Sequence, residues 1–295
     1  VKFQTFHADR LATADAPKAA YQSRADGANQ LEMLRALELD ADAHRMLARQ
    51  CSDQNIIFLS SPFDVESLAF LVDEIGVDSL KIGSGEITNG PLLLAAAQSG
   101  RKVILSTGMS TLDEVRDALE ILAFGYDSGD VTPTSTAREN ITDLAILKDK
   151  VTMLHCTSQY PAPMKDTNLR AMATLRDAFG LRVGFSDHTP GATAAIAAVA
   201  LGAMVIEKHF TLDRSAQGPD HAASLEPDEL ASMIAYIRDV EAALGSGEKT
   251  PAASERETRI IARKSLVALR PVRAGETFTV ENLGVKRSGG GQSPM

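Results

Sequence analysis

The chain has 295 residues, 44% hydrophobic and 23% charged, with a formal net charge of −9 at pH 7. This balance is typical of a globular protein with a sizeable core, and the lack of a basic tract excludes an ordinary nucleic-acid footprint. The longest apolar stretch, residues 194–206, is too short to span a bilayer, and no signal peptide is visible. Two cysteines are too few for a disulfide framework, so we expect a cytoplasmic protein without a membrane partner.

Short β-rich runs alternate with amphipathic segments along the chain. The runs have near-continuous apolar centres, which predicts strands covered on both faces, and the alternation predicts right-handed βαβ units with parallel strands. The predicted strands are residues 1–6, 56–61, 79–84, 102–107, 151–158, 181–187 and 204–210. The clearest predicted helices are residues 65–75, 111–122, 169–179 and 226–244.

Either a (β/α)8 barrel or a doubly wound open sheet would fit this alternation. We favour the barrel because polar residues end nearly every predicted strand, and a barrel collects its strand ends around one ring. These residues are Gln4, Ser60, Glu86, Ser106, Thr157, His188 and His209. Seven strands, with no helix before the first, indicate a barrel whose first strand is missing from this chain. The polar segment 127–140 is expected to be a surface excursion.

The composition changes after residue 245 to Gly, Ser, Lys, Pro and Glu. We therefore predict a barrel domain over residues 1–245, a linker over 246–258 and a partial β-rich domain over 259–295. In this small domain, two short runs, residues 262–269 and 277–285, flank a turn that contains Pro271 and Gly275. Because so short a segment buries little apolar core, we expect it to dock on another part of the protein or a partner, or to continue beyond residue 295.

Two histidines, His188 and His209, end neighbouring predicted strands. Two imidazoles with the nearby carboxylates of Asp187, Glu207 and Asp220 suit a divalent metal that keeps positions open for substrate. The alternative is a pair of hydrogen-bonded histidines packed at the barrel rim.

Two lysines, Lys2 and Lys81, lie inside apolar strands, where a positive charge is costly unless an anion accompanies it. Small hydroxyl residues recur at the strand ends, and together with the lysines they could cradle a phosphate. The alternative is that each lysine pairs with a neighbouring carboxylate. Glu86 and Asp220 could hold sugar hydroxyls or transfer protons, although a plain Asx turn also explains Asp220. We expect His155 to be a hydrogen-bonded strand residue rather than a ligand.

A set of motifs that runs in order along nearly the whole chain resembles the N-acetylneuraminate (sialic acid) synthase family. The motifs are KFQTF (2–6), SSPFD (60–64), KIGSGE (81–86), ILSTGM (104–109), HCTS (155–158), YP (160–161), SDHT (186–189), EKHFT (207–211) and GPD (218–220). The segment APKAAYQ (16–22) looks more like the N-acetylneuraminate branch than the pseudaminate branch.

The resemblance implies a TIM barrel followed by a small antifreeze-like (SAF) domain, in a domain-swapped homodimer. It implies condensation of phosphoenolpyruvate (PEP) with N-acetylmannosamine, assisted by Mn²⁺ or Mg²⁺, to give a nine-carbon 2-keto sugar acid. The matching positions are His188 and His209 for the metal, Lys2, Lys81, Ser84, Ser106 and Ser186 for PEP, and Gln4, Glu86, Tyr160, Asp220 and Arg287 for the sugar. Lys2 and Lys81 would hold the PEP anion, while Glu207 orients ligands or handles a proton.

Three departures from the family pattern bear on this expectation. The family's first strand is absent before Val1, Ser288 replaces a usual proline next to Arg287, and the SAF domain stops short of its usual end. An N-acetylneuraminate synthase is our main interpretation. The alternatives are a sister synthase for legionaminate, pseudaminate or a spore-coat sugar acid, and, from another class, an inactive sugar-binding or assembly module.

Overall fold

The structure is a computed structural model that describes residues 1–25, 27–128 and 144–295. The chain divides into two compact units, Val1–Ala243 and Leu244–Met295. The predicted surface excursion, residues 127–140, begins inside a helix that ends at Ser128, and the rest of it lies outside the described residues.

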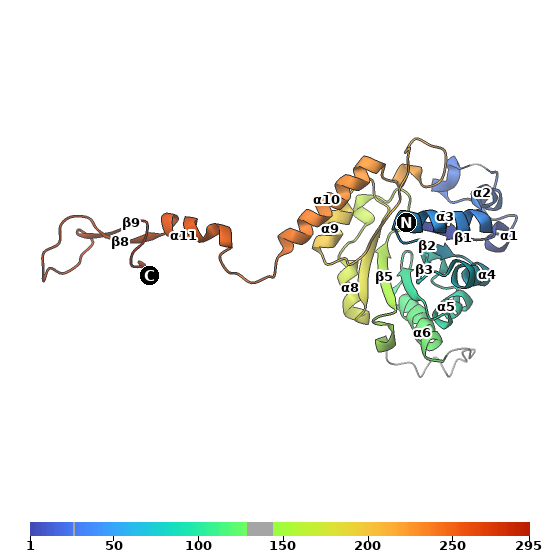
Figure 1. Ribbon diagram of the computed structural model, residues 1–295, viewed down its shortest axis with the longest axis horizontal. Helices are drawn as coiled ribbons and strands as arrows, with labels where there is room; N and C mark the ends of the chain where they lie inside the picture. Colours follow the sequence, from blue (N-terminus) through green and yellow to red (C-terminus); the bar gives the residue numbers. More distant parts are fainter. Residues whose placement is uncertain (26, 129–143) are drawn as a thin grey trace. The chain divides into compact units, whose positions relative to one another are not determined.

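In its described residues the first unit contains seven parallel strands, each of which overlaps one predicted run (Figure 1). β1 pairs with β2, and β3 to β7 form a five-stranded sheet in chain order. The bounds are β1 Lys2–Thr5, β2 Leu59–Pro62, β3 Ser79–Ile82, β4 Lys102–Ser106, β5 Val151–Cys156, β6 Arg182–Asp187 and β7 Ile206–Lys208. The prediction of parallel βαβ units is confirmed. Within the described residues no ladder joins β1 to β7, so the strands form a curled partial barrel.

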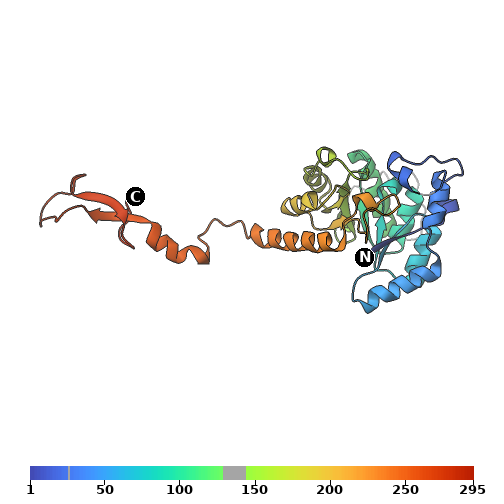
Figure 2. The same cartoon turned by 90° about the horizontal axis from the view of Figure 1, so that it is seen from above.

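Helices surround the outside of the curled strands (Figures 1 and 2). The main ones are α1 Ala8–Leu11, α2 Gln30–Leu37, α3 Ala41–Asp53, α4 Val65–Ala69, α5 Gly90–Gln98, α6 Leu112–Ser128, α8 Ala171–Phe179, α9 Thr193–Ala200 and α10 Pro227–Leu244. Short helical turns cover Ala20–Arg24, Phe70–Ile75, Ser84–Glu86, Leu144–Leu147, Met164–Asp166 and His221–Ala223. Of the described helices, none has the length and apolar character to cross a membrane.

The sequence specifies where several of these helices begin. The side chains of Asn29, Asp40 and Asp64 each accept a hydrogen bond from a backbone N–H in the first turn of α2, α3 and α4. Such caps satisfy donors that have no partner within the helix. α10 begins at Pro227, one residue after the predicted start at residue 226, and Gly245 follows its end with a φ of 59°.

The core lies between the strands and the helices. Leu80, Leu105 and Met153 are fully buried on the sheet, and Leu92 and Leu119 cover it from α5 and α6. Burial of this apolar surface is the main driving force for the fold. It also fixes the carboxyl ends of the strands relative to one another.

The second unit contains two short helical segments and an antiparallel pair of strands. These are Ala253–Glu255, α11 Arg256–Ala262, β8 Lys264–Ala268 and β9 Leu283–Arg287. α11 thus begins inside the segment predicted as a linker. Most side chains here are exposed, with Ser265 and Asn282 as the buried polar ones. A complete antifreeze-like domain is not evident in the described residues.

Candidate active site

The carboxyl ends of the strands bring together side chains that are far apart in the sequence. Lys81 of β3 is buried, with 2% of its side chain exposed, and its Nζ donates hydrogen bonds to Ser106 Oγ at 2.7 Å and to the Ile82 carbonyl oxygen at 3.0 Å. Burial lowers the pKa of Lys81 to about 8, and the negative charge of Glu207 opposes part of that decrease. Lys81 is therefore a cation held in a poorly solvated position.

Glu207 of β7 lies at the centre of a cluster with Lys2, Lys81 and Ser186, which we call the charged cluster. Its Oε2 is 3.0 Å from Lys2 Nζ and 3.8 Å from Lys81 Nζ, and its Oε1 accepts a hydrogen bond from Ser186 Oγ at 2.6 Å. Burial alone would raise the pKa of Glu207, but Lys81, Lys2 and Ser186 lower it to about 2. The carboxyl group is therefore ionised at neutral pH, and strands β1, β3, β6 and β7 all contribute to one charged cluster.

The two predicted metal-binding histidines lie next to each other beyond the ends of β6 and β7. Their ring centroids are 5.3 Å apart, and Tyr160 packs against both, at 4.1 Å from His188 and 5.4 Å from His209. Asp220 Oδ2 is 3.3 Å from His209 Nδ1. Burial alone would raise the pKa of Asp220, but its hydrogen bond to His209 lowers it.

The donor set of these histidines fits a divalent cation. His188 Nδ1 is 2.8 Å from the Thr157 carbonyl oxygen, an acceptor only, so Nδ1 carries the proton and Nε2 keeps its lone pair. Burial lowers the pKa of His188 to about 4, which keeps the ring neutral at pH 7. Among the described residues, however, no group of three or more His, Cys, Asp or Glu side chains is arranged for a metal. The protein would thus supply two imidazole ligands and leave the other positions to water or substrate.

A cluster of small polar groups lies beside Lys81 and involves Gly108. The backbone N–H of Gly108 donates a hydrogen bond to Ser84 Oγ at 3.0 Å, and the Sγ of Cys156 is 3.1 Å from the same oxygen. A Cβ at position 108 would lie 2.3 Å from Ser158 Oγ and 2.8 Å from both Ser84 Oγ and Cys156 Sγ. Glycine is therefore required for these groups to converge.

Two predicted sugar-site residues of the first unit, Gln4 and Glu86, have no described contact with the charged cluster, and a third, Arg287, belongs to the second unit. Gln4 is exposed, and its side chain makes no hydrogen bond to another described residue. Glu86 Oε2 accepts a hydrogen bond from Asn89 Nδ2 at 2.7 Å. Arg287 ends β9 in the second unit and is exposed.

His155 is a hydrogen-bonded strand residue, as predicted, since its Nε2 is 2.8 Å from the Thr167 carbonyl oxygen. Sequence reasoning missed two features. The ring of Tyr21 lies 4.9 Å from that of Tyr160, and Lys208 forms a buried ion pair with Asp187. The rule that selected Lys2 and Lys81, a lysine within an apolar strand, would also have selected Lys208.

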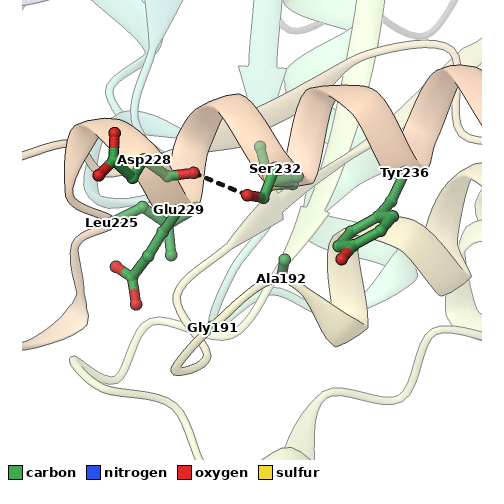
Figure 3. A pocket seen from close by; sticks show the side chains of 8 residues that line it. Gly191, Ala192, Leu225, Asp228, Glu229, Ser232 and Tyr236 are labelled. Atoms are coloured by element: carbon green, nitrogen blue, oxygen red, sulfur yellow. Dashed lines mark hydrogen bonds between the residues drawn. The ribbon is translucent and has the colours of Figure 1, made fainter.

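A separate hollow of about 330 Å³ lies between α10 and the start of α9 (Figure 3). It is lined by Gly191, Ala192, Leu225, Asp228, Glu229, Ser232, Met233 and Tyr236, none of which is a predicted site residue. Two of its polar side chains, Glu229 and Ser232, are engaged within the protein. Glu229 binds Arg214 and the backbone N–H of Glu226, and Ser232 Oγ donates to the Asp228 carbonyl oxygen. These bonds account for Glu229 and Ser232 as part of the first turns of α10.

The fold and the charged cluster define an α/β enzyme with its site at the carboxyl ends of parallel strands. The NeuB family model matches residues 1–249. The N,N'-diacetyllegionaminic acid synthases of Campylobacter jejuni and Legionella pneumophila are 46% and 43% identical, over the whole of this chain and 83% and 78% of theirs. The crystal structure of a sialic acid synthetase from Leptospira borgpetersenii, in complex with citrate, superposes with a TM-score of 0.71 at 33% identity, covering 87% of this chain and 78% of that one.

The chain belongs to the NeuB family and is a sugar-acid synthase that condenses PEP. The family resemblance drawn from the motifs is confirmed. The two relatives named above are legionaminate synthases, so they support the alternative of a sister synthase better than the main interpretation, an N-acetylneuraminate synthase.

Proposed function

We propose that this protein joins PEP to a six-carbon sugar that carries two N-acetyl groups and so makes N,N'-diacetyllegionaminate. The observation that carries the chemistry is the convergence of Lys2, Lys81 and Glu207 at the strand ends, beside His188 and His209. The choice of sugar is supported by the 46% identity to the Campylobacter jejuni synthase over the whole chain.

The lysines are the residues that bind PEP in this proposal. Lys81 is fixed by Ser106 and directs a desolvated positive charge into the site, where a bound anion is attracted more strongly than in water. Lys2 completes the anion site from β1. Ser84 and Ser106 accept hydrogen bonds from Gly108 N–H and Lys81 Nζ, so their own hydroxyl protons can be donated to the remaining oxygens, and Ser186 would turn its hydroxyl from Glu207 to do the same.

His188 and His209 would hold Mn²⁺ or Mg²⁺, an ion that, when bound, polarises a carbonyl group as a Lewis acid. Tyr160 packs against both rings and forms a wall of the sugar site, and Asp220 orients His209 and is available to a sugar hydroxyl. In the reaction, the C2=C3 electron pair of PEP forms the bond from C3 to the aldehyde carbon, and the aldehyde oxygen takes up a proton to become a hydroxyl. Water adds its oxygen at C2 and releases that proton. The C2–O bond to phosphate then breaks, and the hydroxyl left at C2 loses its proton to become the keto group. Glu207 lies within reach of both lysines, and its carboxylate holds them in place or moves a proton.

Two further expectations come from the family resemblance. A domain-swapped homodimer would bring Arg287 of the partner subunit to the N-acyl group of the sugar. Sedimentation analysis of the full chain, together with KM values for an Arg287→Ala variant, tests both. We expect a dimer, and a KM that rises for the sugar but not for PEP.

The function is tested by incubating the full chain with PEP, Mn²⁺ and one sugar at a time, and measuring the release of phosphate and of 2-keto acid. The sugars are N-acetylmannosamine and 2,4-diacetamido-2,4,6-trideoxymannose, with a reaction lacking sugar as control. We expect the doubly acetylated sugar to give the higher kcat/KM. Preference for N-acetylmannosamine would identify a sialic acid synthase. No turnover with any N-acylated hexose would favour a binding or assembly module.

A further inference from the structure

We propose that the buried ion pair between Asp187 and Lys208 sets the spacing of His188 and His209, and thereby the affinity of the site for its metal. The inference rests on the proposed role of these histidines as ligands. The two residues of the pair are partners in the parallel register of β6 and β7. Lys208 Nζ lies 3.0 Å from Asp187 Oδ2, and the side chains are 2% and 0% exposed.

Each histidine directly follows one member of this pair in the sequence. Side chains alternate between the two faces of a strand, so the pair lies on the opposite face from Ser186 and Glu207, which point into the charged cluster. The ion pair therefore joins the two strands at the last position before the chain turns into His188 and His209. Any change in the separation of β6 and β7 at this point would move one imidazole relative to the other.

The pair also holds the backbone on the far side of His188. Asp187 Oδ1 accepts hydrogen bonds from the backbone N–H of Thr189 at 2.8 Å and from its hydroxyl at 2.7 Å, and Lys208 Nζ donates to the Thr189 carbonyl oxygen. His188 is thus fixed at both neighbouring residues, and its own Nδ1 is bonded to the Thr157 carbonyl. This network leaves the ring little freedom to rotate away from His209.

Stability alone does not account for an ion pair at this position. Removing two charges from water costs several kcal/mol per ion, and apolar residues of similar volume often stabilise a core equally well. An apolar pair would not supply the directional bonds that join β6 to β7 and hold Thr189. Groups that hydrogen-bond metal ligands change metal affinity about 10- to 100-fold when they are replaced, and we expect the same range for a pair that positions both ligands through the backbone.

The test is the affinity for Mn²⁺, measured without substrates by titration calorimetry or by the electron paramagnetic resonance of the free ion. Asp187→Asn/Lys208→Met removes both charges together, so that no unpaired charge is left in the core, and the asparagine keeps an acceptor for Thr189. We expect the Kd for Mn²⁺ to rise about 10- to 100-fold while the Kd for PEP changes by less than about threefold. Leu119→Ala, in the buried face of α6, serves as the control for lost stability and should bind Mn²⁺ like the wild type.

A folded double variant with the wild-type Kd for Mn²⁺ would overturn the positioning role. So would an equal loss of affinity for PEP, because that would indicate general damage to the site. If the double variant does not fold, Thr189→Val removes only the hydroxyl bond, and we expect it to weaken Mn²⁺ binding about three- to tenfold. An unchanged Kd in that variant overturns the inference as well. Failure of the wild type to bind Mn²⁺ would instead overturn the metal site itself, and the inference with it.

Discussion

Lys2 Nζ on β1 and Glu207 Oε2 on β7 lie 3.0 Å apart, although the described residues contain no hydrogen-bonded ladder between these strands. The carboxylate of Glu207 also lies 3.8 Å from Lys81 Nζ. One negative charge is therefore placed between two positive charges on different strands. The arrangement leaves a local excess of positive charge in a protein whose overall charge is −9. In the proposed function, these local groups attract the PEP anion, because the protein as a whole does not.

Glu207→Gln should destabilise the protein in a pH-dependent way. The folded-state pKa of Glu207 is about 2, below its ordinary value of 4.5, so its contribution is fully present above pH 4.5 and is lost as the pH falls towards 2. We expect the variant to lose roughly 3 kcal/mol of unfolding free energy at pH 7, and the gap to the wild type to narrow below pH 4.5. Urea unfolding at several pH values measures this gap.

The matched control is Glu241→Gln, which removes an exposed carboxylate paired with Arg238 on α10. It should change the unfolding free energy little at any pH, since exposed ion pairs stabilise by about 1 kcal/mol or less. If the difference in unfolding free energy between the wild type and Glu207→Gln stayed constant from pH 7 to pH 3, this result would contradict the charge arrangement described above.

The affinity for PEP should fall in alkaline solution because of Lys81. Its pKa of about 8 means that the charge is present below pH 8 and is lost as the pH rises through that value. We expect the KM for PEP to rise with pH above 8, by up to about tenfold per pH unit, while the KM for the sugar stays flat. Lys81→Arg keeps its charge over this range and should lack the alkaline rise. The same rise in that variant would assign the pH dependence to another group.

His188→Ala should remove metal binding without unfolding the protein. The variant loses one of the two neutral imidazoles of the proposed site, so we expect the Kd for Mn²⁺ to increase more than about 100-fold. His7→Ala, at an exposed histidine paired with Glu38, is the control and should bind Mn²⁺ normally. Wild-type affinity in His188→Ala would show that the metal binds elsewhere.

The sequence predicts the strands well and the contacts between side chains less well. Continuous apolar runs identify buried parallel strands, so each of the seven predictions overlaps a strand. Lys81 and Glu207 converge because parallel strands end on one side of a sheet, whereas Lys2 begins β1, a position that this rule does not place at the site. The contact between Tyr21 and Tyr160 joins residues 139 positions apart (160 − 21) and leaves no periodic pattern in the sequence. α11 was missed because the Gly, Ser and Pro content of the preceding residues is typical of a linker.

Tyr21 should influence the sugar rather than PEP. Its ring packs on Tyr160, which in turn packs on both histidines, and burial together with the charge of Asp220 raises the pKa of its hydroxyl. Tyr21→Ala removes this support, and we expect the KM for the sugar to rise about two- to tenfold with an unchanged KM for PEP. Tyr21→Phe keeps the ring and should stay close to the wild type. Equal effects on the two KM values would place Tyr21 outside the sugar site.

Gly108→Ala should selectively weaken PEP binding. The new Cβ would lie 2.3 Å from Ser158 Oγ and 2.8 Å from Ser84 Oγ, closer than real contacts allow, so the hydroxyls that converge on this point must move apart. Forcing an extra methyl group into packed surroundings costs about 1–3 kcal/mol, which corresponds to a rise of about tenfold or more in the KM for PEP if the site absorbs the displacement.

The control for this prediction is Gly85→Ala, one residue beyond Ser84, where a Cβ meets nothing within 4 Å. Both variants replace a glycine close to Ser84 with alanine, but only the Cβ at position 108 meets other atoms. The comparison therefore separates the effect of reduced backbone freedom from the effect of the steric clash. We expect Gly85→Ala to bind PEP with an affinity near that of the wild type. If the two variants weakened PEP binding equally, backbone freedom around Ser84 would be the cause, and the cluster at Gly108 would not be part of the anion site.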